Sequence, residues 1–115
     1  DPLVGGRVAV TGLVAYRSDA VPQLAGRLVF GDLPSGEIFH VPLDPLPDGG
    51  QDAIRRVLLR DGDGEPRTFL EVIRLANEAR GRSPATRADL RLDTGPDGRI
   101  FLLNKHDGVV RRLLP

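Results

Sequence analysis

The chain contains no cysteine, methionine or tryptophan, and it has only one tyrosine and two histidines among 115 residues. Without cysteine, disulfide bonds, thiolate metal sites and cysteine nucleophiles are excluded. Basic and acidic side chains balance at 16 each, so the chain lacks the positive surplus with which proteins contact nucleic-acid phosphates. No apolar run approaches the roughly 18 residues of a membrane span. We therefore expect neither a nucleic acid nor a membrane as partner.

The remaining composition is that of a folded domain broken by many turns. Hydrophobic residues make up 40% of the chain and charged residues 28%, which are ordinary values for a globular protein. Fourteen glycines and ten prolines predict frequent turns. The sequence starts with Asp1 and Pro2 rather than methionine, and we expect it to be part of a longer protein.

Seven segments have the alternation, β-branched content and turn-rich flanks typical of strands. They cover residues 7–16, 27–30, 37–41, 56–59, 88–93, 99–103 and 109–113. In the first segment one face is predicted to carry Val8, Val10, Val14 and Tyr16. In the fifth, Leu90 and Leu92 are predicted to point away from the charged residues between them.

One helix is predicted over residues 69–80. Thr68 and Glu71 have the spacing of a capping box, and Gly81 is placed to end the helix in a left-handed turn. The predicted apolar face consists of Phe69, Val72, Ile73, Ala76 and Ala79. The segment 61–86 therefore reads as a loop-and-helix insert between strands.

The sequence repeats itself at an offset of 72 residues. Residues 26–38 and 98–110 share a Gly-Arg start, an apolar strand, a polar turn that ends in glycine, and a second apolar strand. The pattern predicts one hairpin used twice, since glycine supplies the positive φ that tight hairpins need.

Each hairpin follows another predicted strand, so each unit is an antiparallel meander of at least three strands. Repeated four-stranded meanders are typical of β-propeller blades. The fold class is therefore predicted as mainly β, with residues 7–60 forming one full blade, 61–86 the insert, and 87–115 three strands of a closing blade. A propeller needs at least about four blades, so the chain is expected to be its C-terminal part. A small sandwich of two sheets is the alternative.

Four stretches resemble a known family: residues 10–17 (VTGLVAYR), 22–32 (PQLAGRLVFGD), 35–38 (SGEI) and 89–103. They are similar to the C-terminal blades of the glucose/sorbosone dehydrogenase family, six-bladed propellers that oxidise sugars with pyrroloquinoline quinone (PQQ). The resemblance implies a catalytic histidine and a calcium site in blades that this chain does not contain. It also implies the remaining blades as partners and an extracellular or periplasmic location.

In the C-terminal blades, members of that family supply basic residues to the quinone. Aligned on the hairpin turns, those positions hold Pro34, Ala88 and Leu90 here. Arg87 and Arg91 are one residue out of register, which places them on the opposite face of a strand. We therefore assign no catalytic and no metal residue to this chain, and leave its quinone contacts unassigned.

The histidines and acidic turns indicate no other chemistry. His40 and His106 lack a third metal ligand at a familiar spacing, so structural or surface roles are expected. The acidic turn of Asp61, Asp63 and Glu65 does not continue as a calcium loop, because valine occupies the position of the last ligand. Three further carboxylates are expected in ordinary turns: Asp93, Asp97 and Asp107.

Two functional readings follow. In the first, the chain is the C-terminal portion of a sugar dehydrogenase-like propeller, structural for ring closure and inactive alone. In the second, it is a non-catalytic propeller or a small β domain that binds carbohydrate or protein. Both leave open sheet edges, which favour self-association.

Overall fold

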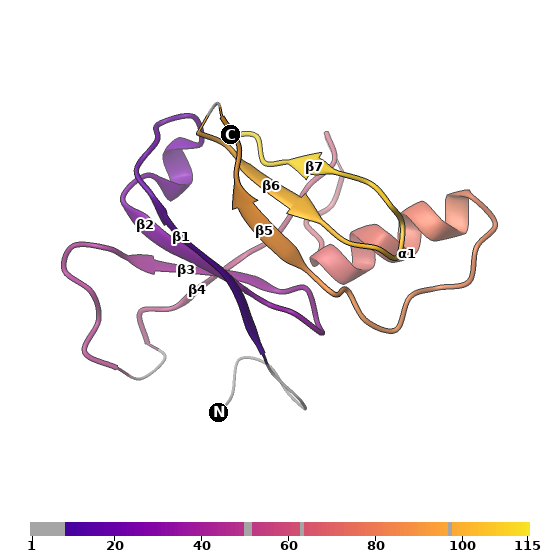
Figure 1. The fold of residues 1–115 in the computed structure, drawn as a ribbon, viewed down its shortest axis with the longest axis horizontal. Helices are drawn as coiled ribbons and strands as arrows, with labels where there is room; N and C mark the ends of the chain where they lie inside the picture. Colours follow the sequence, from indigo (N-terminus) through magenta and orange to yellow (C-terminus); the bar gives the residue numbers. More distant parts are fainter. Residues whose placement is uncertain (1–8, 50–51, 63, 97) are drawn as a thin grey trace.

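A computed structural model describes residues 9–49, 52–62, 64–96 and 98–115. Within these ranges the chain forms two antiparallel sheets and one α-helix (Figure 1). The first sheet has the strand order β1-β2-β3-β4, with β1 at Val10–Tyr16, β2 at Arg27–Asp32, β3 at Ile38–Pro42 and β4 at Arg55–Val57. The second has the order β5-β6-β7, with β5 at Arg91–Thr94, β6 at Ile100–Leu103 and β7 at Arg111–Arg112. The prediction of a mainly β chain built from antiparallel meanders is confirmed.

Strand β1 contains a bulge at Gly12, where its pairing with β2 shifts register. Val14 and Tyr16, after the bulge, are buried, whereas Val10, before it, is 74% exposed. The prediction that Val10 shares the buried face of Val14 and Tyr16 is therefore wrong, because the extra residue turns the start of the strand over. Val8 lies outside the described residues.

Strand β5 begins at Arg91, three residues later than the predicted segment 88–93. The cause is Asp89, whose φ of 48° is left-handed and interrupts the extended backbone. The predicted alternation nevertheless holds, since Ala88 before this residue and Leu90 after it are both 0% exposed and Leu92 is only 5% exposed.

Strands β4 and β7 are also shorter than predicted. Strand β4 ends at Val57, and Leu59 forms only an isolated bridge with Arg67. Strand β7 covers two residues of the predicted segment 109–113, although the Leu113 N–H continues the pairing with a hydrogen bond to the Ile100 carbonyl.

Helix α1 (Phe69–Ala79) begins at the predicted capping box. The Glu71 N–H donates to Thr68 Oγ1 at 3.3 Å, and the Thr68 N–H donates to Glu71 Oε1 at 2.8 Å. Gly81 follows the helix with a φ of 69°, as predicted.

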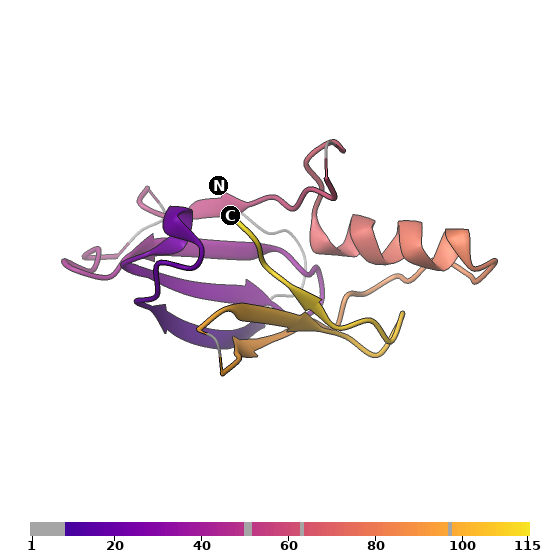
Figure 2. The same ribbon diagram turned by 90° about the horizontal axis from the view of Figure 1, so that it is seen from above.

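The buried residues of α1 are Phe69, Ile73 and Asn77. The prediction that Ala79 belongs to the buried face is wrong: Ala79 is exposed. The helix projects to one side of the two sheets, so its last turn extends past the core (Figure 2).

The predicted hairpin repeat is present in the strand registers. Val29 of β2 pairs with His40 of β3, and Phe101 of β6 pairs with Arg112 of β7. Both partners in the second hairpin are 72 residues after their counterparts in the first, so the two hairpins share one register.

The turns of the two hairpins share their hydrogen bonds as well. In the first, the Ser35 N–H and hydroxyl both donate to Asp32 Oδ2, and Ser35 Oγ accepts the N–H two residues later. In the second, the Asp107 N–H donates to Asn104 Oδ1, Asn104 Nδ2 donates to Asp107 Oδ1, and this oxygen accepts the N–H two residues later. The same three bonds are made, with the side-chain donor and acceptor exchanged.

The two sheets stack through unlike faces. The four-stranded sheet contributes its inner face to the core: Val14, Tyr16, Val29 and Ile38. The three-stranded sheet contributes Leu92, Ile100 and Leu102. In the repeat, Ile100 and Leu102 correspond to Leu28 and Phe30 of the first sheet. Leu28 and Phe30 lie on the outer face of the first sheet, opposite the face that carries Val29, because side chains alternate along a strand and cross-strand partners share a face. The inner face of the first sheet therefore packs against the second sheet's equivalent of the outer face, which is a head-to-tail arrangement.

Three glycines of the first sheet bring the sheets into close contact. A Cβ atom on Gly31 would lie 2.4 Å from Leu90 Cδ2, and one on Gly36 would lie 2.5 Å from Ala88 Cβ. A Cβ atom on Gly12 would meet Leu92 Cγ at 2.5 Å. The missing Cβ atoms leave shallow depressions, called sockets below, in which the side chains of Ala88, Leu90 and Leu92 pack.

The socket at Gly36 can be tested with Gly36→Ala. We expect it to lower the free energy of unfolding by about 2–4 kcal/mol, from the left-handed backbone (φ 73°) and from overpacking against Ala88. Gly26→Ala is the matched control, because Gly26 has a φ of 72° but, apart from its chain neighbours, no described atom lies within 4 Å of the added Cβ; its expected loss is about 1 kcal/mol. Urea unfolding measures both, and equal losses would contradict the socket.

Candidate functional site

The candidate site lies where the turn after β2 meets the segment before β5. The Ala88 N–H donates to the Pro34 carbonyl at 2.7 Å, and the Leu90 N–H donates to the Leu33 carbonyl at 3.1 Å. These two backbone hydrogen bonds join the first sheet to the second. They fix the chain direction at residues 87–91 and thereby determine which side chains face the core.

Alternate side chains of this segment point to opposite sides. Ala88 and Leu90 are both 0% exposed in the core. Arg87, Asp89 and Arg91 belong to the other side, where they line an open groove. The charged residues therefore lie side by side because their apolar neighbours fill the glycine sockets.

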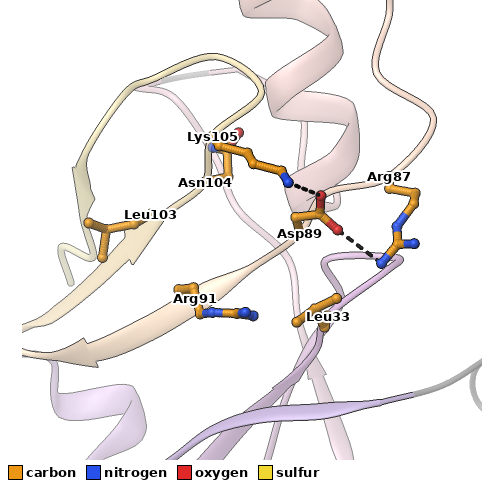
Figure 3. A pocket seen from close by; sticks show the side chains of 7 residues that line it. All are labelled: Leu33, Arg87, Asp89, Arg91, Leu103, Asn104 and Lys105. Carbon is orange, nitrogen blue, oxygen red and sulfur yellow. Dashed lines mark ion pairs between the residues drawn. The ribbon is translucent and has the colours of Figure 1, made fainter.

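The groove has a volume of about 560 Å³ (Figure 3). Besides the three charged residues of the segment, its lining residues come from the end of β2 and from the end of β6: Leu33, Leu103, Asn104 and Lys105. This volume is within the range of small-molecule sites.

Asp89 is the centre of an ion-pair network at one end of the groove. Its Oδ1 lies 3.0 Å from Arg87 Nη2, and its Oδ2 lies 2.7 Å from His106 Nε2 and 3.9 Å from Lys105 Nζ (Figure 3 shows the Arg87 and Lys105 pairs). Desolvation raises the pKa of the Asp89 carboxyl, but the His106 hydrogen bond and the cationic neighbours outweigh it, so the pKa lies below its usual value. Asp89 is thus held as a carboxylate.

The structure brings the three aligned quinone positions together but makes two of them unavailable to any ligand. Pro34 is half-buried, and Ala88 and Leu90 are fully buried in the core. None of the three side chains can donate a hydrogen bond or carries charge. The residues at these positions do not fit the carboxylates of the quinone. The prediction that Arg87 and Arg91 face the opposite way is confirmed.

The two histidines lie apart and in different roles. His106 is in the β6–β7 turn and bonds to Asp89, which is the structural role predicted for it. His40 is in β3, where burial together with the charges of Arg27 and Arg55 lowers its pKa. Its Nδ1 is buried without a hydrogen-bond partner among the described residues.

No group of three or more histidine, aspartate or glutamate side chains among the described residues could hold a metal ion. Asp61 and Glu65 are exposed turn residues, and Asp63 lies outside the described residues. Asp97 also lies outside them, while Asp93 is exposed at the end of β5.

Asp107 is more than the turn carboxylate that the sequence indicated, because its side chain is 0% exposed. Its Oδ2 accepts a 2.6 Å hydrogen bond from Arg111 Nη2, and the Arg111 guanidinium also lies 5.6 Å from the centre of the Phe69 ring. Desolvation raises the pKa of Asp107, but the hydrogen bonds from Arg111, Val109 N–H and Asn104 outweigh it and lower the pKa overall.

Sequence reasoning missed Lys105, Asn104 and Leu33 as groove residues. The alternation of Arg87, Asp89 and Arg91 does indicate a shared charged face. No local pattern, however, shows that the end of β6 lies beside this segment, because that proximity depends on the pairing of β5 with β6.

The Asp107 pair predicts an acid-sensitive fold. Because the folded-state pKa is depressed, the pair stabilises the fold above the unfolded-state pKa of about 3.9, and this contribution is lost as pH falls through the folded-state value. We expect Asp107→Asn to be less stable than wild type at pH 7 and the difference to shrink toward pH 2. Urea unfolding at a series of pH values measures this. A difference that stays constant with pH would show that the charge of Asp107 does not contribute.

No helix within the described ranges is long and apolar enough to cross a membrane. Comparison with protein-family models, curated proteins and solved structures found no match to this chain.

Proposed function

We propose that the chain provides two consecutive blades of a β-propeller of the glucose/sorbosone dehydrogenase kind, and that its role is to close and stabilise the ring rather than to catalyse. The observation that carries this proposal is the head-to-tail stacking of two sheets whose hairpins share one register. The resemblance of residues 10–17 and 22–32 supports the choice of family.

The stacking favours a propeller over a two-sheet sandwich. If two equivalent sheets form a closed pair about a twofold axis, the same face of each meets the other. Here the inner face of the first sheet meets the face of the second sheet that is equivalent, in the repeat, to the outer face of the first sheet. A head-to-tail contact does not close after two units, so it is suited to further blades.

The outer face of the first sheet is the surface on which a preceding blade would pack. It consists of Val10, Leu13, Ala15, Leu28, Phe30, Phe39 and Val41. Leu13 is 68% exposed and Val10 74% exposed, Leu28 and Phe30 are half-buried, and Phe39 and Val41 are buried. The repeat counterparts of Leu28 and Phe30 are covered by a neighbouring sheet, so we assign the same kind of partner, another antiparallel sheet, to this face.

The proposed role excludes catalysis by this chain alone. The histidine and the calcium site of the family belong to other blades, and the aligned quinone positions hold one proline and two core residues. A second function, a module that binds carbohydrate or protein, is favoured by the burial of Ala88 and Leu90. An extracellular or periplasmic location follows from the resemblance and is part of the proposal.

The outer face predicts self-association of the isolated chain, because a second copy supplies the missing sheet. We expect sedimentation velocity to show mass increasing with concentration, and Leu13→Glu to weaken the association by about tenfold or more, since it places a charge in an apolar contact. Leu75→Glu is the matched control, because Leu75 is 44% exposed on α1 and away from the outer face. A wild-type chain that stays monomeric, or equal effects of both substitutions, would contradict the proposal.

The non-catalytic role predicts no sugar oxidation by the chain. With PQQ, calcium and glucose added, we expect dye reduction to be the same as without protein, because the proposal assigns the catalytic histidine to another blade, and the side chains at the aligned quinone positions, Pro34, Ala88 and Leu90, have neither charge nor a hydrogen-bond donor. A sugar-dependent rate that rises with the concentration of the chain, and is lost on heating, would overturn the proposal.

A further inference from the structure

The groove beside Asp89 carries more positive than negative charge. Its lining contains three cationic side chains, Arg87, Arg91 and Lys105, and a single carboxylate, Asp89. The chain as a whole has no net charge. The groove therefore concentrates a local excess of two positive charges that overall composition does not show.

The cations of the groove are not all used by the protein. Asp89 has both of its oxygens engaged, by Arg87 and by His106. Arg91 donates to the Leu90 carbonyl, and within the part of the chain that the structure describes it has no carboxylate partner. Lys105 is 80% exposed and lies 3.9 Å from Asp89. Arg91 and Lys105 thus have donors available for an anionic group.

Asp89 is held in an unusual backbone conformation. Apart from glycines, it is the one residue within the described ranges with a positive φ, at 48°. Such conformations cost free energy and cluster at binding sites. Here the left-handed residue directs the carboxylate into the groove while its two neighbours fill the core.

Apolar side chains complete the lining. Leu33 lies across from Arg91 in Figure 3, and Leu103, which is 38% exposed, lies beside β5. Arg91 lies between Leu33 and Leu103 in Figure 3, so a ligand in this space would contact cationic groups and aliphatic surface together. Such a lining suits an organic molecule with an anionic group better than a bare ion.

We propose that this groove binds a small organic molecule through a carboxylate or phosphate group, which Arg91 and Lys105 hold while Asp89 orients Arg87. Two guanidinium groups and one ammonium group match the oxygens of either anion. The site is formed entirely by residues of this chain, so it does not depend on the proposed ring.

The test is a titration of the folded chain followed by amide NMR at low ionic strength, with benzoate, inorganic phosphate and neutral glucose as probes. We expect saturable shifts around residues 87–91 and 103–105 with a dissociation constant on the order of 1 mM, weakening as salt is added. Stronger binding of benzoate than of inorganic phosphate would support the site, because only benzoate has an apolar body for Leu33 and Leu103 to contact. Stronger binding of inorganic phosphate would contradict the proposal that the ligand is an organic anion. Shifts that are absent up to about 50 mM anion, or equal for glucose, would overturn it.

Paired substitutions separate binding from structure. Arg91→Gln should weaken anion binding about tenfold, whereas Arg60→Gln, which removes the same charge from an exposed position outside the groove, should leave it unchanged. Asp89→Asn should strengthen binding severalfold, because the amide removes the charge that repels an anion while its Oδ1 can still accept a hydrogen bond from Arg87. If that variant loses its dispersed spectrum, Lys105→Gln replaces it and should weaken binding. Equal effects of Arg91→Gln and Arg60→Gln would refute the proposal.

Discussion

The close approach of the two sheets depends on the absence of three Cβ atoms. Gly12, Gly31 and Gly36 leave room for the side chains of Leu92, Leu90 and Ala88, respectively. Leu90 and Ala88 are buried completely as a result. Protein interiors are packed nearly as densely as organic crystals. The space left by a missing Cβ atom is therefore filled by a neighbouring side chain, which approaches the glycine backbone closely. The backbone hydrogen bonds from Ala88 and Leu90 to the preceding sheet are possible only at this short separation.

The same contact determines the groove. Once Ala88 and Leu90 are buried, Asp89 between them and Arg87 and Arg91 on either side must face the other way. The left-handed backbone at Asp89 lets the segment pair with the turn after β2 before it continues as β5. A site for an anionic group and the core of the molecule are therefore two sides of one five-residue segment.

Much of the fold could be predicted from the sequence, because its signals are local or repeated. The capping box at Thr68 and the terminating Gly81 depend on residues a few positions apart, and the hairpin repeat is recognised because the same pattern recurs after 72 residues. The bulge at Gly12 and the left-handed Asp89 could not be read in this way, since glycine and aspartate are also common in ordinary turns. The sequence predicts one part of the groove, because the alternation before β5 shows a charged face. It does not predict the contribution of Lys105, which reaches this face only through the long-range pairing of β5 with β6.

Helix α1 contacts the turns of both hairpins, and the residues that make these contacts differ between the two repeats. At its start, Phe69 and the backbone of Leu70 lie against Gly36, in the turn of the first hairpin. Beyond its end, Arg80 Nη1 donates to the Asp107 carbonyl in the turn of the second hairpin, at 2.8 Å. An eleven-residue helix spans about 16 Å, so α1 is a rigid strut between equivalent turns of neighbouring sheets.

The second turn has Asp107 where the first has Ser35. The buried Asp107 carboxylate binds Arg111, and the Arg111 guanidinium in turn lies over the ring of Phe69 at the start of the helix. The two hairpin turns thus differ at the position where the second turn contacts helix α1, while the register of the two hairpins is the same.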